Sequence, residues 1–460
     1  MSSINTKPTP GPSGLEAIRH WIRMARDPLA GFVGLYNEYG DAVRIPLTPG
    51  RAFFLLSRPE HAEHIFVRHQ ERYAKAFTYR PMKDVLGDGL LTSEGETWQR
   101  HRRVVQPIFS HRHIQGFGPL IAEVTRERVS SWRIGSVVDL GAEMRGLTMS
   151  LIGHILFGID LADRADTVGR AVSKLQSALI PAAALSAVSP QRTRTLARFL
   201  VPGLESAATA LDSLVDEIIE ARLASPHAEP SDLLDILMFG SDGERFSRQE
   251  IHNEMMILVL AGHETTTNTL TWALTLLSRF PAARARIVAE VEHALGDRNA
   301  TAADVDSLPW TRAVVSESLR LYPSAWDLER DALVDDKVGD IEVSAGDTIA
   351  IAPYLLHRHP EFWPNPEGFD PGRFLPGNGG GRPRCAYFPF GGGRRICVGA
   401  GLAQLEATIG LATIAQSCTL DLQPGITLDA RADITLRPRH PMRATVLAPN
   451  RSHVDDLVPS

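Results

Sequence analysis

The segment 390–399, which reads FGGGRRICVG, constrains this chain more than any other feature of its sequence. Glycines such as Gly393 and Gly399 permit positive φ angles and let a flat ligand approach the backbone closely. Arg395, two residues before Cys397, can reach an anionic group on that ligand. A lone thiolate framed in this way suits the axial ligand of a haem iron. The alternative is an ordinary buried cysteine beside a glycine-rich turn.

The composition indicates one globular unit. With 460 residues, 43% of them hydrophobic, the chain can bury a large core, and no linker rich in proline, glycine or serine divides its middle. We expect a single domain over 1–460, with flexible ends at 1–14 and 450–460. The net charge of −6 argues against a nucleic-acid partner. Three cysteines without a CxxC pair indicate a reducing compartment. No apolar stretch is long enough for a signal peptide or a membrane span, so a soluble, cytoplasmic monomer is expected.

Hydrophobic periodicity predicts a mainly α fold with a minor β component. Helical spacing dominates between about residues 59 and 295, and Ser247 with Glu250 three residues later is a capping-box signal. The clearest helices are expected at 15–25, 207–223, 249–278 and 400–417. Short strands are expected at 42–45, 52–56, 332–334, 341–343, 348–352, 419–422 and 445–447.

Two further motifs precede the cysteine loop. Glu317 and Arg320 stand at i and i+3 on one face of a predicted helix, and Arg373 follows on a turn. With the spacing Phe-x-x-Gly-x-Arg-x-Cys-x-Gly that begins at Phe390, they resemble the Glu-x-x-Arg, Pro-x-Arg-Phe and haem-loop motifs of the cytochrome P450 family, in the family's order. The resemblance covers about residues 31–447. It implies the cytochrome P450 fold, a triangular helical prism with a small β-rich corner.

The resemblance also implies how haem b would be bound. Trp98 and Arg102, at i and i+4 on a predicted helix, resemble an element that holds a haem propionate, and two further arginines match other propionate contacts. Each of these arginines has the alternative of an ordinary surface position. The residues that the resemblance places at the cofactor are Trp98, Arg102, Ala261, Arg330, Phe390, Gly393, Arg395, Cys397 and Gly399, with Cys397 as the iron ligand.

Glu317, Arg320 and Arg373 would form a buried ionic network behind the haem loop. Such a network helps to specify geometry and is not an obvious source of stability. The other two cysteines, Cys385 and Cys418, are expected to be structural.

The segment 261–266, AGHETT, lies within the longest predicted helix. Glycine and threonine are poor helix formers, by roughly 0.5–1 kcal/mol each relative to alanine, so we expect a local opening of the helix there. Glu264 and Thr265 resemble the acid–alcohol pair that relays protons to iron-bound dioxygen in the family. The alternatives are a surface charge and threonine hydroxyls bonded to carbonyls one turn earlier. His263 is expected to lie to one side in a polar contact.

The implied activity is that of a haem-thiolate monooxygenase. O2 would be the co-substrate, and electrons would come from NAD(P)H through a ferredoxin or flavodoxin and its reductase. Candidate residues on the docking face are Arg100, Arg103, Arg112 and Arg394. Three alternatives stay open: a peroxide-driven or non-oxygenating reaction on the same haem, a non-enzymatic haem-binding protein, and a zinc protein that uses the cysteine.

The substrate is expected to be a medium-to-large lipophilic molecule: a terpenoid, steroid, fatty acid or macrocycle, met in secondary metabolism or lipid oxidation. The segments 77–91 and 179–188 and the central helix are rich in apolar residues that would face it. The pocket candidates are Leu86, Leu90, Met256, Leu260, Ala261, Trp326 and Asp327. Asp327 stands out because an unpaired carboxylate is costly in an apolar pocket. It would contact a polar group of the substrate, or pair with an arginine or water at the rim.

Overall fold

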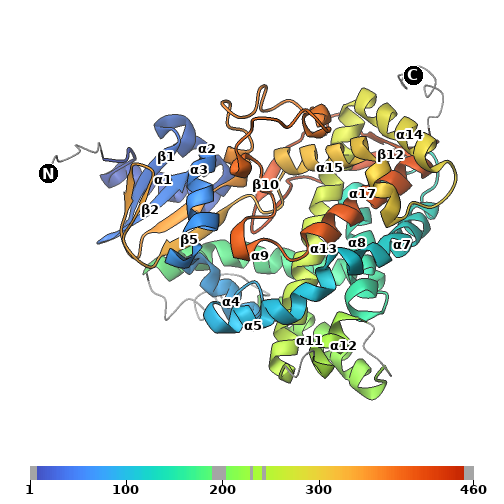
Figure 1. Cartoon of the computed structure of the whole chain (residues 1–460), viewed down its shortest axis with the longest axis horizontal. Coiled ribbons are helices and arrows are strands. Elements are labelled where there is room, and N and C mark those ends of the chain that lie inside the picture. Colours follow the sequence, from blue (N-terminus) through green and yellow to red (C-terminus); the bar gives the residue numbers. More distant parts are fainter. Residues whose placement is uncertain (1–7, 189–203, 228–231, 241–244, 450–460) are drawn as a thin grey trace.

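The computed structural model describes residues 8–188, 204–227, 232–240 and 245–449. Helices fill most of the molecule, and a sheet lies at one corner, at the left in Figure 1. The helices are α1 (Gly14–Arg26), α2 (Pro28–Tyr39), α3 (Pro59–Glu63), α4 (Arg80–Leu86), α5 (Gly95–Val105), α6 (His111–Ile114), α7 (Gly118–Ser130), α8 (Leu140–Phe157), α9 (Ala165–Val188), α11 (Leu204–Ala224), α12 (Leu233–Phe239), α13 (Arg248–Arg279), α14 (Pro281–Leu295), α15 (Pro309–Leu321), α16 (Pro353–Leu356) and α17 (Ala400–Ser417).

The long helix α13 organises the helical part. It begins with the expected capping box, in which Ser247 and Glu250 satisfy each other's backbone N–H groups. Its 32 residues pack against α8, α15 and α17, and most of its side chains are buried. The helix is continuous, so the expected opening at 261–266 is absent. The threonine hydroxyls instead bond to carbonyls one turn earlier, as Thr265 does to Ala261 at 2.7 Å, and this leaves the backbone ladder intact.

The corner sheet has the strand order β1-β2-β8-β5-β3, and a second sheet has the order β4-β12-β9. In the first sheet β3 pairs with β5 in antiparallel fashion and places Lys75 directly opposite Arg330. The strands are β1 (Ala42–Thr48), β2 (Arg51–Leu56), β3 (Tyr73–Lys75), β4 (Val137–Asp139), β5 (Leu328–Ala332), β6 (Asp336–Val338), β7 (Ile341–Val343), β8 (Thr348–Ile351), β9 (Thr419–Leu422), β10 (Ala430–Ala432), β11 (Leu436–Pro438) and β12 (Arg443–Leu447).

One strand prediction is wrong. We expected a strand at 332–334, but β5 ends at Ala332, and Leu333 and Val334 are exposed in the bend that follows. The apolar run at 332–334 suggested burial, whereas pairing with β3 and β8 selects the more polar residues 328–332. Sheet pairing between segments distant in sequence decided this boundary.

The other expected elements are present, with ends that differ by a few residues at most. The last helix, α17, has the expected bounds, Ala400–Ser417. Part of the N-terminal segment is held against β1, since the Arg44 N–H donates to the Pro10 carbonyl at 2.8 Å. Among the described residues no helix combines the length and the apolar character that crossing a bilayer requires.

Candidate active site

The loop before α17 has a conformation that strongly favours glycine at two positions. Gly391 and Gly393 have φ angles of +72° and +65°. A Cβ atom on Gly393 would also overlap the carbonyl oxygen of Phe66. The loop closes on itself because the Cys397 N–H donates to the Phe390 carbonyl at 2.9 Å. These constraints fix the backbone on which the thiol is presented.

Cys397 is solvent-accessible, yet protein surrounds it. Burial is the largest influence on its thiol and raises the pKa, while the Gly399 N–H and the Arg102 guanidinium act in the opposite direction. Cys397 lies three residues before the first residue of α17. The helix dipole favours a negative charge near that N-terminus. The position suits a thiolate ligand.

Helix α13 has an accessible strip among its buried residues. Ala261 is exposed in the middle of the helix, and Leu260, Gly262, Glu264 and Thr265 are partly exposed. Small or accessible residues at mid-helix leave space for a bound group. A hydrogen bond of 3.2 Å from Thr266 to Glu406 joins α13 to α17, the helix that follows the cysteine loop.

Among the described residues, the side chains of Glu264 and Thr265 form no hydrogen bond with each other. Its two carboxyl oxygens accept instead from Thr435 at 2.8 Å and from Gln176 at 2.5 Å. Burial raises the pKa of Glu264, which favours the protonated form. His263 is buried and lies to one side, with its Nε2 3.2 Å from the Arg145 carbonyl.

Four basic side chains gather beside the loop, and the sequence had singled out three of them. Arg395 lies over the Trp98 ring at 4.0 Å and pairs with Glu94. Arg102 donates to the carbonyl before Cys397, that of Ile396, at 2.9 Å. The basic side chains are Lys75, Arg102, Arg330 and Arg395.

Lys75 is the basic residue that the sequence analysis missed. The pKa of Lys75 is lowered to about 7, first by burial and then by the charges of Arg395 and Arg330. Like charges directly opposite each other on paired strands are destabilising, as Lys75 and Arg330 are here. A bound anion would relieve that repulsion, so the cluster fits the carboxylates of a haem. No local motif marks Lys75, because it reaches the site only through the pairing of β3 with β5.

The three residues expected to form an ionic network lie together. Glu317 and Arg320 are fully buried and form an ion pair at 2.7 Å, and Arg373 Nε is 3.5 Å from Glu317. Arg320 also donates to backbone carbonyls of the loop that leads to Arg373, those of Pro366 at 2.6 Å and Gly368 at 2.9 Å. The network ties α15 to this loop.

The pocket candidates fall into two groups. Leu86, Leu90 and Met256 are buried in the main hydrophobic core, and Leu260, Ala261 and Asp327 are at least partly accessible. Trp326 differs from expectation: it packs edge to face against Phe32 and donates to the Asp433 carbonyl at 2.8 Å. Its ring packs in a core cluster beneath the sheet, separate from the main core. The hydrogen bond of the indole N–H stabilises the ring in that buried position. Of the expected segment 179–188, most side chains lie outside the described residues.

Asp327 has a neighbour that the sequence analysis did not single out. Glu329 in β5, two residues after Asp327, hydrogen-bonds Asp327, and Thr78 donates to Glu329. Burial raises the pKa of both carboxyl groups. The Oδ1 atom of Asp327 is buried without a hydrogen-bond partner among the described residues. The spacing Asp-x-Glu was visible in the sequence, but only the strand made it informative.

The comparisons with known proteins agree with this geometry. The family model described as Cytochrome P450 matches residues 9–441. Cyclooctatin synthase of Streptomyces melanosporofaciens is 34% identical over 437 residues, which cover 93% of this chain and 93% of that protein. Cyclooctat-9-en-7-ol 5-monooxygenase of the same organism is 32% identical over 426 residues, covering 91% and 90%. The crystal structure of the cytochrome P450DA heme domain matches with a TM-score of 0.84 and 26% identity over 98% of this chain and 99% of that one. The chain therefore belongs to the cytochrome P450 family of haem-dependent monooxygenases.

Proposed function

We propose that this chain binds haem b through Cys397 and oxidises a lipophilic molecule that carries a polar group. The observation that supports this most directly is the glycine-constrained loop, which presents an accessible thiol beside Arg102. Trp98, Arg102, Arg330 and Arg395, with Lys75, would hold the propionates. When bound, a thiolate-ligated haem supplies the activation of O2 and the insertion of one oxygen atom into a C–H or C=C bond.

The residues of α13 would position the substrate and move protons. Glu264, whose pKa is raised by burial, is held in a fixed position by hydrogen bonds from Gln176 and Thr435 and would relay protons from there. The Thr265 hydroxyl donates a hydrogen bond to the Ala261 carbonyl. The lone pairs of the hydroxyl oxygen can then accept a hydrogen bond from the reacting group.

Replacement of Thr265 by alanine is expected to preserve haem and substrate binding but to lower the product formed per NAD(P)H consumed, by roughly tenfold or more if the hydroxyl contributes the usual share of proton transfer. The measurement is product and hydrogen peroxide per electron supplied. Thr265→Ser keeps the hydroxyl and should restore most of the coupling. Unchanged coupling in Thr265→Ala would remove this residue from the mechanism. Equal turnover with hydrogen peroxide and no reductase would favour the peroxide-driven alternative.

The substrate class that we propose is a terpenoid alcohol. One relative, by its name, acts on cyclooctat-9-en-7-ol, an alcohol with a carbon–carbon double bond. The accessible strip of α13 offers Leu260 and Ala261 to an apolar skeleton. Asp327 offers a buried carboxyl oxygen without a partner among the described residues, and a substrate hydroxyl would satisfy it.

Asp327→Leu is therefore expected to weaken the binding of an alcohol by about tenfold, the size of one buried hydrogen bond, and to spare the hydrocarbon of the same skeleton. Dissociation constants follow from the absorption change of the ferric haem on titration. Asp327→Asn keeps hydrogen-bonding capacity at nearly the same volume and serves as the matched variant. Equal changes for the alcohol and the hydrocarbon would show that Asp327 pairs within the protein only.

We propose that a ferredoxin or flavodoxin delivers the electrons at the face next to the cysteine loop. The segment after α5 packs there, with Phe109 near Gly399 and Ile114 near Gly401. Arg103, Arg112 and Arg394 are exposed on these elements. Arg100, also expected on this face, is instead paired with Glu250 and lies over the Phe246 ring.

Reversing two of these charges, in Arg103→Glu with Arg112→Glu, is expected to slow ferredoxin-supported reduction by roughly tenfold at low ionic strength and to flatten its dependence on salt. Reduction by dithionite, which needs no docking, should be unchanged and serves as the control. A rate that responds neither to salt nor to the reversal would place the docking surface elsewhere.

A further inference from the structure

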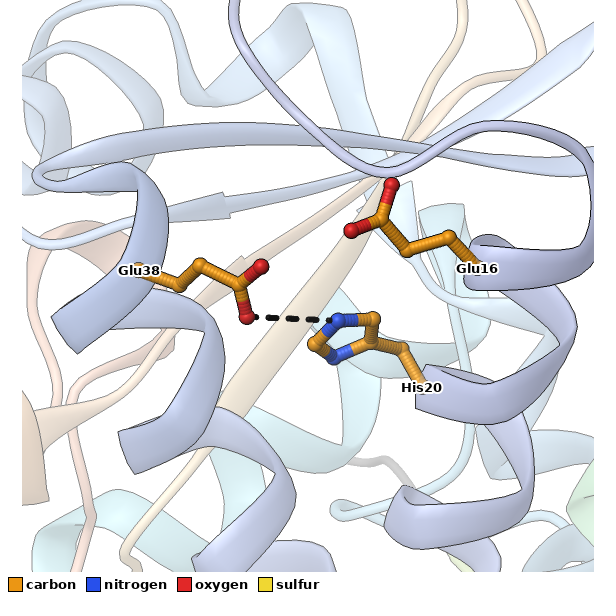
Figure 2. Close-up of side chains that lie close together, drawn as sticks. All are labelled: Glu16, His20 and Glu38. Carbon is orange, nitrogen blue, oxygen red and sulfur yellow. Dashed lines mark ion pairs between the residues drawn. The ribbon is translucent and has the colours of Figure 1, made fainter.

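A group of three potential metal ligands lies far from the haem loop in sequence, where α1 meets α2. Glu16 and His20 stand four residues apart on α1, so their side chains lie on one face of that helix. Glu38 comes from the last turn of α2. One ligand atom from each residue lies within 4.8 Å of the others, and Figure 2 shows the imidazole directed between the two carboxylates.

His20 is the most informative member of this group. Its side chain is only 9% exposed, and Figure 2 shows that its Nε2 faces the carboxylates, whereas its Nδ1 is turned away from them. Its Nε2 lies 3.5 Å from the nearer Glu38 oxygen, longer than the usual hydrogen bond. Two ligands on one tetrahedral zinc ion are about 3.3 Å apart, given metal–ligand bonds of about 2.0–2.1 Å. The imidazole and the carboxylate are therefore spaced as two ligands of one ion.

The two carboxylates create a negative field at the same point. Tyr39, which follows Glu38, hydrogen-bonds to both Glu16 and Glu38. Hydrogen bonds of this kind to ligating carboxylates are common around metal sites. The half-exposed Glu38 leaves one side open for water to complete the coordination.

We propose that Glu16, His20 and Glu38 bind a divalent transition-metal ion, with Zn2+ as the best fit, and that this ion fastens α1 to α2. An imidazole with two carboxylates favours Zn2+ over Mg2+ or Ca2+, which prefer oxygen ligands alone. The α1–α2 pair packs through Phe32 against Trp326, the residue before Asp327. The ion would therefore stabilise the packing of this helix pair against the core cluster that contains Trp326.

A second group, His227 with Asp232 and Asp235, is a weaker candidate. Both of its carboxylates already form buried ion pairs with Arg222, at 2.7 Å for Asp232. A metal ion would have to displace that guanidinium, so this group provides a natural control.

The test uses the haem-loaded, full-length protein, freed of adventitious metal with EDTA and then titrated with ZnCl2 in a calorimeter. Wild type should show one site of submicromolar affinity and a melting temperature that rises with zinc concentration. Glu38→Gln and His20→Asn should each weaken that site at least tenfold and abolish the rise in melting temperature. His227→Asn should leave both unchanged.

Three results would overturn the proposal: no saturable zinc site in wild type, equal zinc affinity in Glu38→Gln and wild type, or loss of the site in His227→Asn alone. Because His20 is buried, its replacement could disturb folding, so Glu38→Gln, at a half-exposed residue, carries the decision. The haem absorption spectrum of each variant shows whether the fold is retained, and the result does not depend on catalytic activity.

Discussion

Cys397→Ser is expected to abolish the red-shifted absorption band of the reduced, CO-bound protein. A serine hydroxyl has nearly the same shape but does not ionise at neutral pH, so it cannot supply the thiolate that gives this band. The loop conformation depends on Gly391 and Gly393 and on the hydrogen bond from the residue-397 N–H to Phe390, all of which the variant keeps. Monooxygenase activity should fall below detection, while the far-ultraviolet circular dichroism stays close to that of wild type.

The matched controls are the two other cysteines. Cys385 and Cys418 are buried, and burial raises the pKa of each thiol. Cys385→Ser and Cys418→Ser should keep the red-shifted band and lose some stability only. An unchanged band in Cys397→Ser would contradict the assignment of the iron ligand and, with it, the proposed function.

Arg320→Ala is expected to lower the free energy of unfolding by about 3–5 kcal/mol, because it leaves the carboxylate of Glu317 buried without its main partner. The guanidinium also donates to carbonyls of His357, Pro366 and Gly368 at 2.6–2.9 Å, and these would lose their donors. A loss of this size is a large part of the 5–15 kcal/mol typical of a folded domain, so haem content should fall as well. Urea unfolding followed by circular dichroism measures the effect.

Arg312→Ala, on the same helix, is the control. Arg312 pairs with Asp306 at 3.0 Å, but both side chains are more than half exposed, and such pairs contribute about 0–1 kcal/mol. If the two variants lost equal stability, the burial of the Glu317–Arg320 pair would have no special importance here.

The sequence alone determined the features that depend on local spacing. The run of glycines, arginine and cysteine at 390–399 restricts the backbone to one loop conformation. The loop and its thiol could therefore be predicted without knowledge of the fold. Helix α13 was predictable for a similar reason, because its capping box and its apolar spacing are local properties. The order of three motifs then predicted the family, which the comparisons confirm.

Only the tertiary structure decided the features that depend on pairing between distant segments. Lys75 joins the basic cluster because β3 pairs with β5. Glu264 accepts hydrogen bonds from Gln176 and Thr435, which lie far from it in sequence. Trp326 was expected in the substrate pocket, but its indole N–H donates a hydrogen bond to the Asp433 carbonyl. The unbroken α13 reflects a balance between helix propensity, which disfavours glycine and threonine, and burial along most of its length, which prevails. Hydrogen bonds and burial between residues far apart in the chain have no signature at any single position, and for that reason the sequence could not reveal them.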